Sequence, residues 1–375
     1  MSHAISLDSL LNLPAMGIPV VNYLPETTWE FGAAAQGYFR LPNQERTSIV
    51  QLDGTYSLNK QWYINAQGTL YFKAKGERRE AKGERREARE WQLQFKAGYS
   101  DRPATYYGVY GDPHFANEGN TGIGMLRRGT PYQLQRGYLH VQAPISVGKD
   151  WAVGPMADLL IAQYEIAGKY KTPDPLVQAA LGAVGLYDSR DNVFYPTRGI
   201  FFKLSASAAW TSQVDILEGQ QAAINGLLSA DLRQFVPLPC NLVLAWQFKA
   251  QLMLSEYYIS HLTLYPMLPR LGGQDGIRGI NSDMFRDDIM LAFQAELRIP
   301  IWSIFRGAVF AGIGDVYDYH NWHWAIPKVG YGVGLRATIN KAKVNIRFDI
   351  ARSNVDPRWN NRNAYSFYLT ATEAF

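Results

Sequence analysis

The sequence has a single cysteine, and none of its 375 residues belongs to a long uninterrupted apolar run. Cys240 has no second cysteine with which to form an internal disulfide, so cysteine usage says little about the redox compartment. No stretch reaches the roughly 18 to 20 consecutive apolar residues that a membrane-spanning helix needs. The start, MSHAISLDSLLNLP, also lacks the basic segment, apolar core and cleavage site of a secretion signal. If the chain is exported, we expect that its signal has been removed.

Motifs of common enzyme classes are also missing. There is no G-x-S-x-G nucleophile turn and no phosphate-binding loop. The six histidines are scattered, and the closest pair, His320 and His323, does not have a metal-binding spacing. We therefore expect no enzyme active site, no cofactor and no metal.

Aromatic residues are abundant, with 23 Tyr, 17 Phe and 10 Trp. Membrane-spanning β-barrels carry such residues in girdles at the two membrane interfaces. A chain that crosses a membrane without apolar helices must pair its backbone groups between strands of a closed barrel. The composition thus favours a transmembrane β-barrel.

Period-2 alternation in segments of about ten residues is the strongest signal, because it matches a tilted membrane strand. In 242–254, Leu, Trp and Phe alternate with Gln and Lys, and 61–73 and 289–299 repeat the pattern. A soluble sandwich could alternate in the same way with its apolar face inward. The membrane interpretation is favoured because Trp and Phe lie near the ends of the apolar faces, and because short and long connections alternate along the chain.

This pattern predicts a closed antiparallel barrel of about sixteen strands. The strands are expected near 27–40, 46–58, 61–73, 89–99, 105–112, 131–145, 150–166, 177–189, 199–211, 224–236, 241–256, 286–300, 302–317, 328–340, 341–352 and 364–375. The short connections, among them 58–61 and 237–241, are predicted on the periplasmic side with both termini. The long ones, among them 74–88 and 257–285, are predicted to be extracellular.

Two segments lie outside this strand pattern. Residues 1–26 are too few for a folded domain, so they are predicted to be a periplasmic tether below the barrel or a plug in the lumen, and 27–375 the barrel. The tandem repeat AKGERRE–AKGERRE at 74–87 falls in a predicted external loop. It could bind lipopolysaccharide phosphates or simply be a solvated hairpin tip.

The strand phase also predicts a positively charged lumen. Bases expected to face inward outnumber the acids; the bases are Arg40, Lys96, Lys203, Arg233, Lys249, Arg278, Arg298, Arg306, Arg336 and Arg347, and the acids are Glu30, Asp231, Glu296 and Asp349. The inward bases could favour anions along a conducting path, or they could be held in ion-pair networks along the wall.

Two motifs go beyond generic barrel patterning. DSRDNVFYPTRG at 188–199 combines a tight turn at Pro196 and Gly199 with the charged residues Asp188, Arg190 and Asp191. LGGQDGIRGI at 271–280 is a glycine-rich stretch within the long loop 257–285, and its Arg278 offers a planar five-donor fork.

Together these motifs resemble those of the BamA/TamA family, the bacterial surface-antigen barrels of Gram-negative outer membranes. The first resembles the family's periplasmic turn, and Gly276, Ile277, Arg278 and Gly279 resemble its hallmark tetrapeptide at the tip of the sixth extracellular loop. The resemblance covers roughly 27–375. It includes no periplasmic transport-associated repeat, so the chain resembles a barrel-only member.

The resemblance implies that the loop folds into the lumen, where Arg278 binds acids of the inner wall. Glu296 matches the family's wall glutamate, and the strand phase independently turns it inward. A second acid would be expected at position 312, which is Gly312 here, and the nearest acid is Asp315. The ending YSFYLTATEAF, with Phe375, resembles the C-terminal signal read by the assembly machinery.

Three functions remain open at this point: a barrel for outer-membrane protein assembly or translocation, a small-molecule pore, and a structural subunit that binds other proteins. An inward-folded loop favours the first over an open pore. The expected partners are the lipid bilayer and lipopolysaccharide, together with periplasmic or outer-membrane proteins, and no nucleic acid. The expected location is the bacterial outer membrane.

Overall fold

The computed structural model describes most of the chain. The described residues are 15–24, 28–41, 46–73, 90–106, 130–166, 170–171, 175–212, 222–255, 267–273, 276–282, 284–318, 327–338, 345–355 and 365–370. The predicted C-terminal signal at Phe375 and the AKGERRE repeat lie outside these ranges.

The described chain is almost entirely strand. The strands are β1 (Ala15–Leu24), β2 (Thr28–Phe39), β3 (Ser48–Ser57), β4 (Trp62–Lys73), β5 (Glu90–Tyr106), β6 (Thr130–Gln142), β7 (Ile145–Ser146), β8 (Trp151–Ile166), β9 (Tyr170–Lys171), β10 (Leu176–Asp188), β11 (Gly199–Ser212), β12 (Ala222–Pro237), β13 (Val243–Ser255), β14 (Ile289–Trp302), β15 (Phe305–Tyr317), β16 (Lys328–Thr338), β17 (Asn345–Ser353) and β18 (Tyr365–Thr370). A 3-10 turn, η2 (Pro239–Asn241), joins β12 to β13. Among the described residues, no helix is long and apolar enough to cross a membrane.

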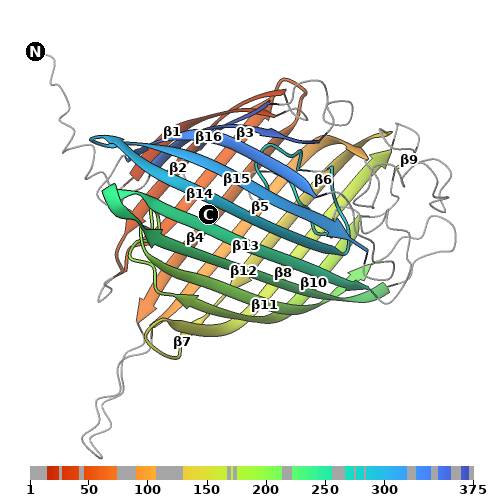
Figure 1. Ribbon diagram of the computed structural model, residues 1–375. Helices are drawn as coiled ribbons and strands as arrows, with labels where there is room; N and C mark the ends of the chain where they lie inside the picture. Colours follow the sequence, from red (N-terminus) through yellow and green to blue (C-terminus); the bar gives the residue numbers. More distant parts are fainter. Residues whose placement is uncertain are drawn as a thin grey trace, which may run out of the picture.

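Sixteen of these strands form a closed antiparallel barrel (Figure 1). Strands β7 and β9 have two residues each and only extend neighbouring hairpins. The other strands each pair with the next along the chain, and β1 pairs with both β2 and β18. Closure satisfies the edges that an open sheet would expose to lipid. The predicted fold and strand number are confirmed.

Two of the individual strand predictions are wrong, although the total is right. Ala15–Leu24 is the first barrel strand and not part of a tether. Gly17 and Pro19 interrupt its pattern, and proline cannot donate to a ladder. The separate strand predicted at 105–112 is not found, because Thr105 and Tyr106 continue β5 and the rest lies outside the described residues.

Because β1 is added before the predicted first strand, the connections between the first strands lie at the opposite ends of the barrel from those predicted. We call the end at which β13 stops the loop end, and the end that carries the turn 189–198 the turn end. Asp188 N–H donates to Asp150 O, so the connection between β7 and β8 lies at the turn end. Trp91, at the start of β5, pairs with Ile145 of β7. The connection from β4 to β5 therefore also lies at the turn end. Leu58 N–H donates to Trp29 O beside the β1–β2 connection, at the loop end. The connection that carries the AKGERRE repeat therefore leaves the barrel at the turn end, together with 237–241, and 58–61 lies at the loop end. The sequence predicted the reverse, with 74–88 on the side of loop 257–285 and 58–61 on the side of 237–241.

The two faces of the wall have the polarity of a membrane barrel. Large apolar side chains point outward and are exposed, with Leu181 at 74% and Ile224 at 65%. Polar and charged side chains are buried in the interior, including five arginines among the largest fully buried residues. Exposed aromatic residues lie near both ends: Trp29, Tyr56, Trp62, Trp210 and Tyr365 at the loop end, and Phe39, Trp151 and Trp302 at the turn end. This polarity excludes the soluble sandwich, whose apolar face would point inward.

The topology predicts opposite accessibility for two short turns. Cys240 is exposed at the turn end, whereas Asn59 lies in the loop-end turn. In intact cells, a membrane-impermeant maleimide should label one of wild type and the Asn59→Cys/Cys240→Ser variant, but not both. Membrane disruption should expose the other site. Equal labelling of both sites in intact cells would contradict the strand order.

Candidate functional site

The tip of loop 256–288 is folded tightly by backbone hydrogen bonds. Ile277 N–H donates to Leu271 O over 2.9 Å, and Gly273 N–H donates to Ile280 O over 2.9 Å. Gly279 has φ +91°, and a Cβ there would lie 2.7 Å from Arg352 O. Glycine is required at this position for both its positive φ and its close approach to β17.

Apolar side chains anchor the same loop to the wall. A buried cluster joins Leu271, Ile277, Ile280, Met284 and Phe285 of the loop to Met290, Ala292 and Val316 of β14 and β15. Burying one large apolar side chain contributes about 1.5–3 kcal/mol. The loop therefore has a core of its own before any charged contact is made.

Arg278 lies between two carboxylates of the inner wall. Its Nη2 is 3.0 Å from Glu296 Oε2 on β14, and its Nη1 donates to Asp349 Oδ2 on β17 over 2.7 Å. The guanidinium also lies 3.5 Å from the centre of the Phe310 ring. The three charged side chains are at most 1% exposed, so their charges must be compensated by one another.

Three further arginines complete what we call the arginine–carboxylate network: Arg278, Glu296, Arg298, Arg336, Arg347 and Asp349. Arg336 contacts Glu296 at 3.0 Å and Asp349 at 2.5 Å. Arg298 Nε lies 3.1 Å from Glu296 Oε1, and Arg347 Nε lies 3.4 Å from Asp349 Oδ2. Each carboxylate thus serves several guanidiniums, which ties the loop to β14, β16 and β17.

The second carboxylate does not come from the strand that the family resemblance indicated. A Cβ at Gly312 would lie 3.3 Å from Ile277 Cγ2, so this position is close against the loop tip. Asp315, the nearest acid in sequence, pairs instead with Lys328 over 2.6 Å. Asp349 supplies the second contact from β17. The strand alternation predicts that Asp349 faces inward. It does not predict that Asp349 pairs with Arg278, because this pairing depends on the register of four strands.

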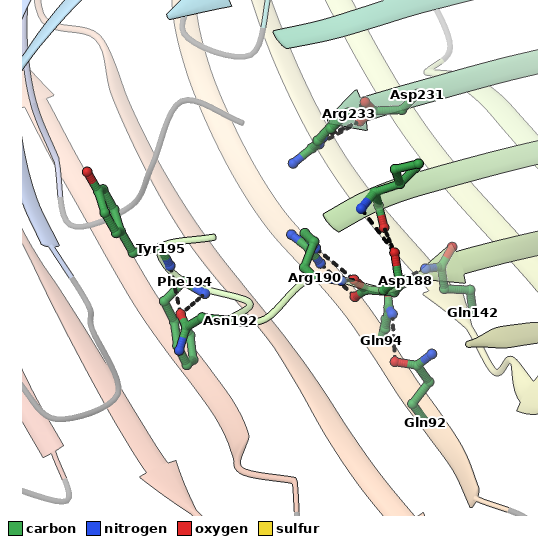
Figure 2. Close-up of polar contacts among 12 residues, drawn as sticks. Gln92, Gln94, Gln142, Asp188, Arg190, Asn192, Phe194, Tyr195, Asp231 and Arg233 are labelled. Atoms are coloured by element: carbon green, nitrogen blue, oxygen red, sulfur yellow. Dashed lines mark hydrogen bonds and ion pairs between the residues drawn. The ribbon is translucent and has the colours of Figure 1, made fainter. Parts of the chain in front are cut away.

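The motif turn 188–199 is fixed by its own side chains (Figure 2). Arg190 donates twice to Asp188, each time over 2.8 Å. Asp191 Oδ1 accepts from the backbone N–H groups of Thr197 and Arg198, at 2.8 and 3.2 Å. Gly199 has φ +107°, and a Cβ there would lie 2.4 Å from Ser189 O. The charged residues of this motif therefore stabilise the turn itself.

This turn also reaches the network. Arg298 Nη1 donates to Pro196 O over 2.9 Å, and the Arg298 guanidinium lies 4.7 Å from the centre of the buried Tyr195 ring. Phe194 packs edge-on against Tyr38 of β2, with 5.9 Å between ring centres. Figure 2 shows Phe194 and Tyr195 well away from Asp188 and Arg190 at the base of the turn. The turn 189–198 thus lies across the opening of the barrel at the turn end. Arg298 contacts both this turn and Glu296, and Glu296 in turn contacts Arg278 of the loop.

The loop also contributes to an acidic cluster near its return to β14. Asp287 is fully buried, and its Oδ2 has no hydrogen-bond partner among the described atoms. Burial, together with the nearby charges of Asp288, Asp318 and Asp315, raises the pKa of Asp287 to about 8. Among the described residues, no group of three or more His, Cys, Asp or Glu is arranged to hold a metal ion.

A closed sixteen-strand barrel with an apolar outer face and a charged interior defines an outer-membrane β-barrel protein. The model of the Omp85 superfamily domain matches residues 173–375, and the chain belongs to this superfamily. The protein is located in the bacterial outer membrane.

Solved structures of the same fold include BamA of Haemophilus ducreyi lacking POTRA domains 1–3, which is 13% identical with a TM-score of 0.56. CdiB of Acinetobacter baumannii is 9% identical with a TM-score of 0.55, and CdiB of Escherichia coli 11% identical with 0.57. The matches cover 95–96% of this chain but 70%, 59% and 62% of the three others. No curated protein sequence matches significantly.

The network predicts a large effect for Arg278→Ala. Removing one member of a buried ion pair leaves the others uncompensated and typically costs about 3–5 kcal/mol. We expect a clear fall in the melting temperature and faster proteolysis of loop 256–288. Arg278→Lys should restore only part of the loss, because lysine lacks the bidentate fork.

Two comparisons make this prediction specific. Glu296→Gln and Asp349→Asn should also destabilise, and the Arg278→Ala/Glu296→Gln double variant should be less than additive. Asp231→Asn, which removes the partner of the less buried Arg233, should cost less. If Arg278→Ala leaves melting and proteolysis unchanged, the loop is held by its apolar core alone.

Asp287 predicts a pH effect on the same loop. Because its pKa is raised in the folded protein to about 8, the folded state keeps a proton that the unfolded chain releases above about pH 4. Stability should therefore decrease as pH rises from about 5 to 8. Proteolysis of the loop should accelerate over this range, and Asp287→Asn should flatten the profile. A profile identical in both proteins would refute the assignment.

Proposed function

We propose that this chain is the barrel of a machine that assembles proteins into the bacterial outer membrane or translocates them across it, a non-enzymatic role. Membership of the Omp85 superfamily supports this proposal, and so does the way in which the barrel closes. The proposed partners are the bilayer with its lipopolysaccharide, the polypeptide substrate, and periplasmic or outer-membrane proteins.

The observation that carries the proposal is the seam between β1 and β18. Only three residue pairs join these strands in the described chain, Val21 with Leu369, Asn22 with Tyr368 and Tyr23 with Phe367. The adjacent β1–β2 ladder has ten pairs. Strand pairing is the main barrier to opening a barrel wall in lipid, so this seam is the place where a substrate strand could enter at least cost.

An open pore is less consistent with the interior. The loop tip and the turn 189–198 both contact the arginine–carboxylate network, which supports a lumen that they obstruct rather than a passive channel filled with water. A purely structural subunit would need no weak seam. In this proposal, the contacts of the loop hold β14 to β17 in place while β1 and β18 separate.

Locking the seam tests this proposal. In the Cys240→Ser background, a disulfide between Val21→Cys and Leu369→Cys should abolish insertion of a reporter barrel protein in proteoliposomes, and reductant should restore it. Opposed residues of antiparallel strands have a Cα separation compatible with a disulfide.

A matched cross-link between Ala180→Cys and Ala209→Cys, which are opposed on β10 and β11, should leave insertion intact. Insertion that persists through a fully oxidised β1–β18 seam would reject lateral opening. Cation- or anion-selective conductance without insertion would favour the pore.

A further inference from the structure

The outward face of β2 carries three small residues in succession between two large ones. Its outward positions run from Phe31 through Ala33, Ala35 and Gly37 to Phe39. Both phenylalanine side chains are exposed, at 51% and 41%. Because outward positions of one strand are about 7 Å apart, the outer surface is lowered along this strand between the two rings.

The strands on either side of β2 complete an open groove of about 460 Å³ on this face. Small residues of β1 and β2 are directly opposed there, and two larger residues of β3 border them; the lining residues are Ala15, Gly17, Ala35, Gly37, Val50 and Leu52. Gln36 also borders the groove, but its side chain is buried on the inner side of the wall. The surface of the groove is therefore almost entirely apolar.

Two glycines of the groove are not required by the fold itself. A Cβ at Gly17 would meet no atom within 4 Å, and a Cβ at Gly37 would meet only Val50 O, at 4.0 Å. Neither glycine has a positive φ. Glycine inside a strand weakens the strand and often marks a place where a ligand or another backbone approaches closely. The groove is thus open space on the outside of the wall, kept free of side chains at a cost to the strands.

The groove lies on the face of the wall that contacts the bilayer. The pair Leu24–Thr28 of β1 and β2 lies at the loop end, so the pair Ala15–Gly37 lies nearer the turn end. An apolar surface in this position is covered by what the hydrocarbon layer contains. A second barrel would present a convex wall to it, whereas an acyl chain is thin and flexible and can follow a depression. The shape of the groove therefore favours a lipid chain over a protein.

We propose that this groove binds one acyl chain of a phospholipid and holds it against β1 and β2 beside the seam. Within a bilayer, apolar groups gain little by leaving lipid for protein, so retention depends on van der Waals packing, for which small residues allow close approach. Gly17 lies on the seam strand, four residues before Val21, which pairs with Leu369 of β18. Phospholipid is the source, rather than lipopolysaccharide, because the groove is nearer the turn end, which the sequence predicts on the periplasmic side.

The groove can be tested on the barrel purified in a mild non-ionic detergent, without an activity assay. The probes are dioleoyl phosphatidylethanolamine and, in a separate titration, lipid A. Native mass spectrometry counts the lipid molecules that the protein retains at each concentration. Wild type should retain one phospholipid at its tightest site and should retain it better than lipid A.

Filling the groove should displace the phospholipid. Gly17→Leu and Gly37→Leu each place a side chain in open space and should weaken retention about tenfold, since roughly ten atom–atom contacts with the chain are lost. Gly185→Leu is the matched control. It adds the same side chain to the outward face of β10, where a Cβ also meets no atom within 4 Å, and it should retain phospholipid as wild type does.

A second pair of variants removes the edge of the groove instead of filling it. Leu52→Ala should weaken retention, whereas Leu204→Ala on β11, at a similar exposure of 49% against 51%, should not. Heat-modifiable migration on gels checks that each variant is folded. The proposal is overturned if Gly37→Leu and Gly185→Leu retain phospholipid equally, if wild type prefers lipid A, or if a second copy of the chain is bound in place of lipid.

Discussion

Glu296 is the residue on which the interior of this barrel depends. Its carboxylate is fully enclosed by wall, loop and turn and meets Arg278, Arg298 and Arg336 at 3.0–3.1 Å. Enclosing a carboxylate away from water costs several kcal/mol unless it is paired and hydrogen-bonded. That constraint fixes where the three guanidiniums lie. One belongs to loop 256–288 and another holds the turn 189–198, so one wall side chain joins structures from both ends of the barrel.

Much of this arrangement follows from the sequence. Alternation places Glu296, Arg298 and Asp349 on the inner face, and a glycine-rich segment places Arg278 in a loop able to approach the wall. The pairing of Arg278 with Asp349 does not follow, because it depends on barrel register across β14 to β17. Nor does β1, since Gly17 and Pro19 remove the strand pattern on which prediction rests. Missing β1 also reversed the predicted end of the 58–61 turn.

The proposed function depends on the position of β1. Among the described residues, its ladder to β2 has ten residue pairs and its ladder to β18 has three. Pro19 lies outside the three pairs that join β1 to β18. The arginine–carboxylate network, by contrast, lies on β14, β16 and β17 and includes the loop. In the described chain, the network and the three-pair seam therefore lie on neighbouring parts of the same wall, and the proposed lateral opening needs only the seam to separate.

Hydrogen exchange in the Glu296→Gln variant tests most directly whether this carboxylate joins the two ends. The backbone amides of Ile277 and Gly273 report on the loop, and those of Thr197 and Arg198 report on the turn. We predict faster exchange at both sets, because Arg278 and Arg298 lose a common partner. Faster exchange in the loop alone, with the turn unchanged, would contradict the account.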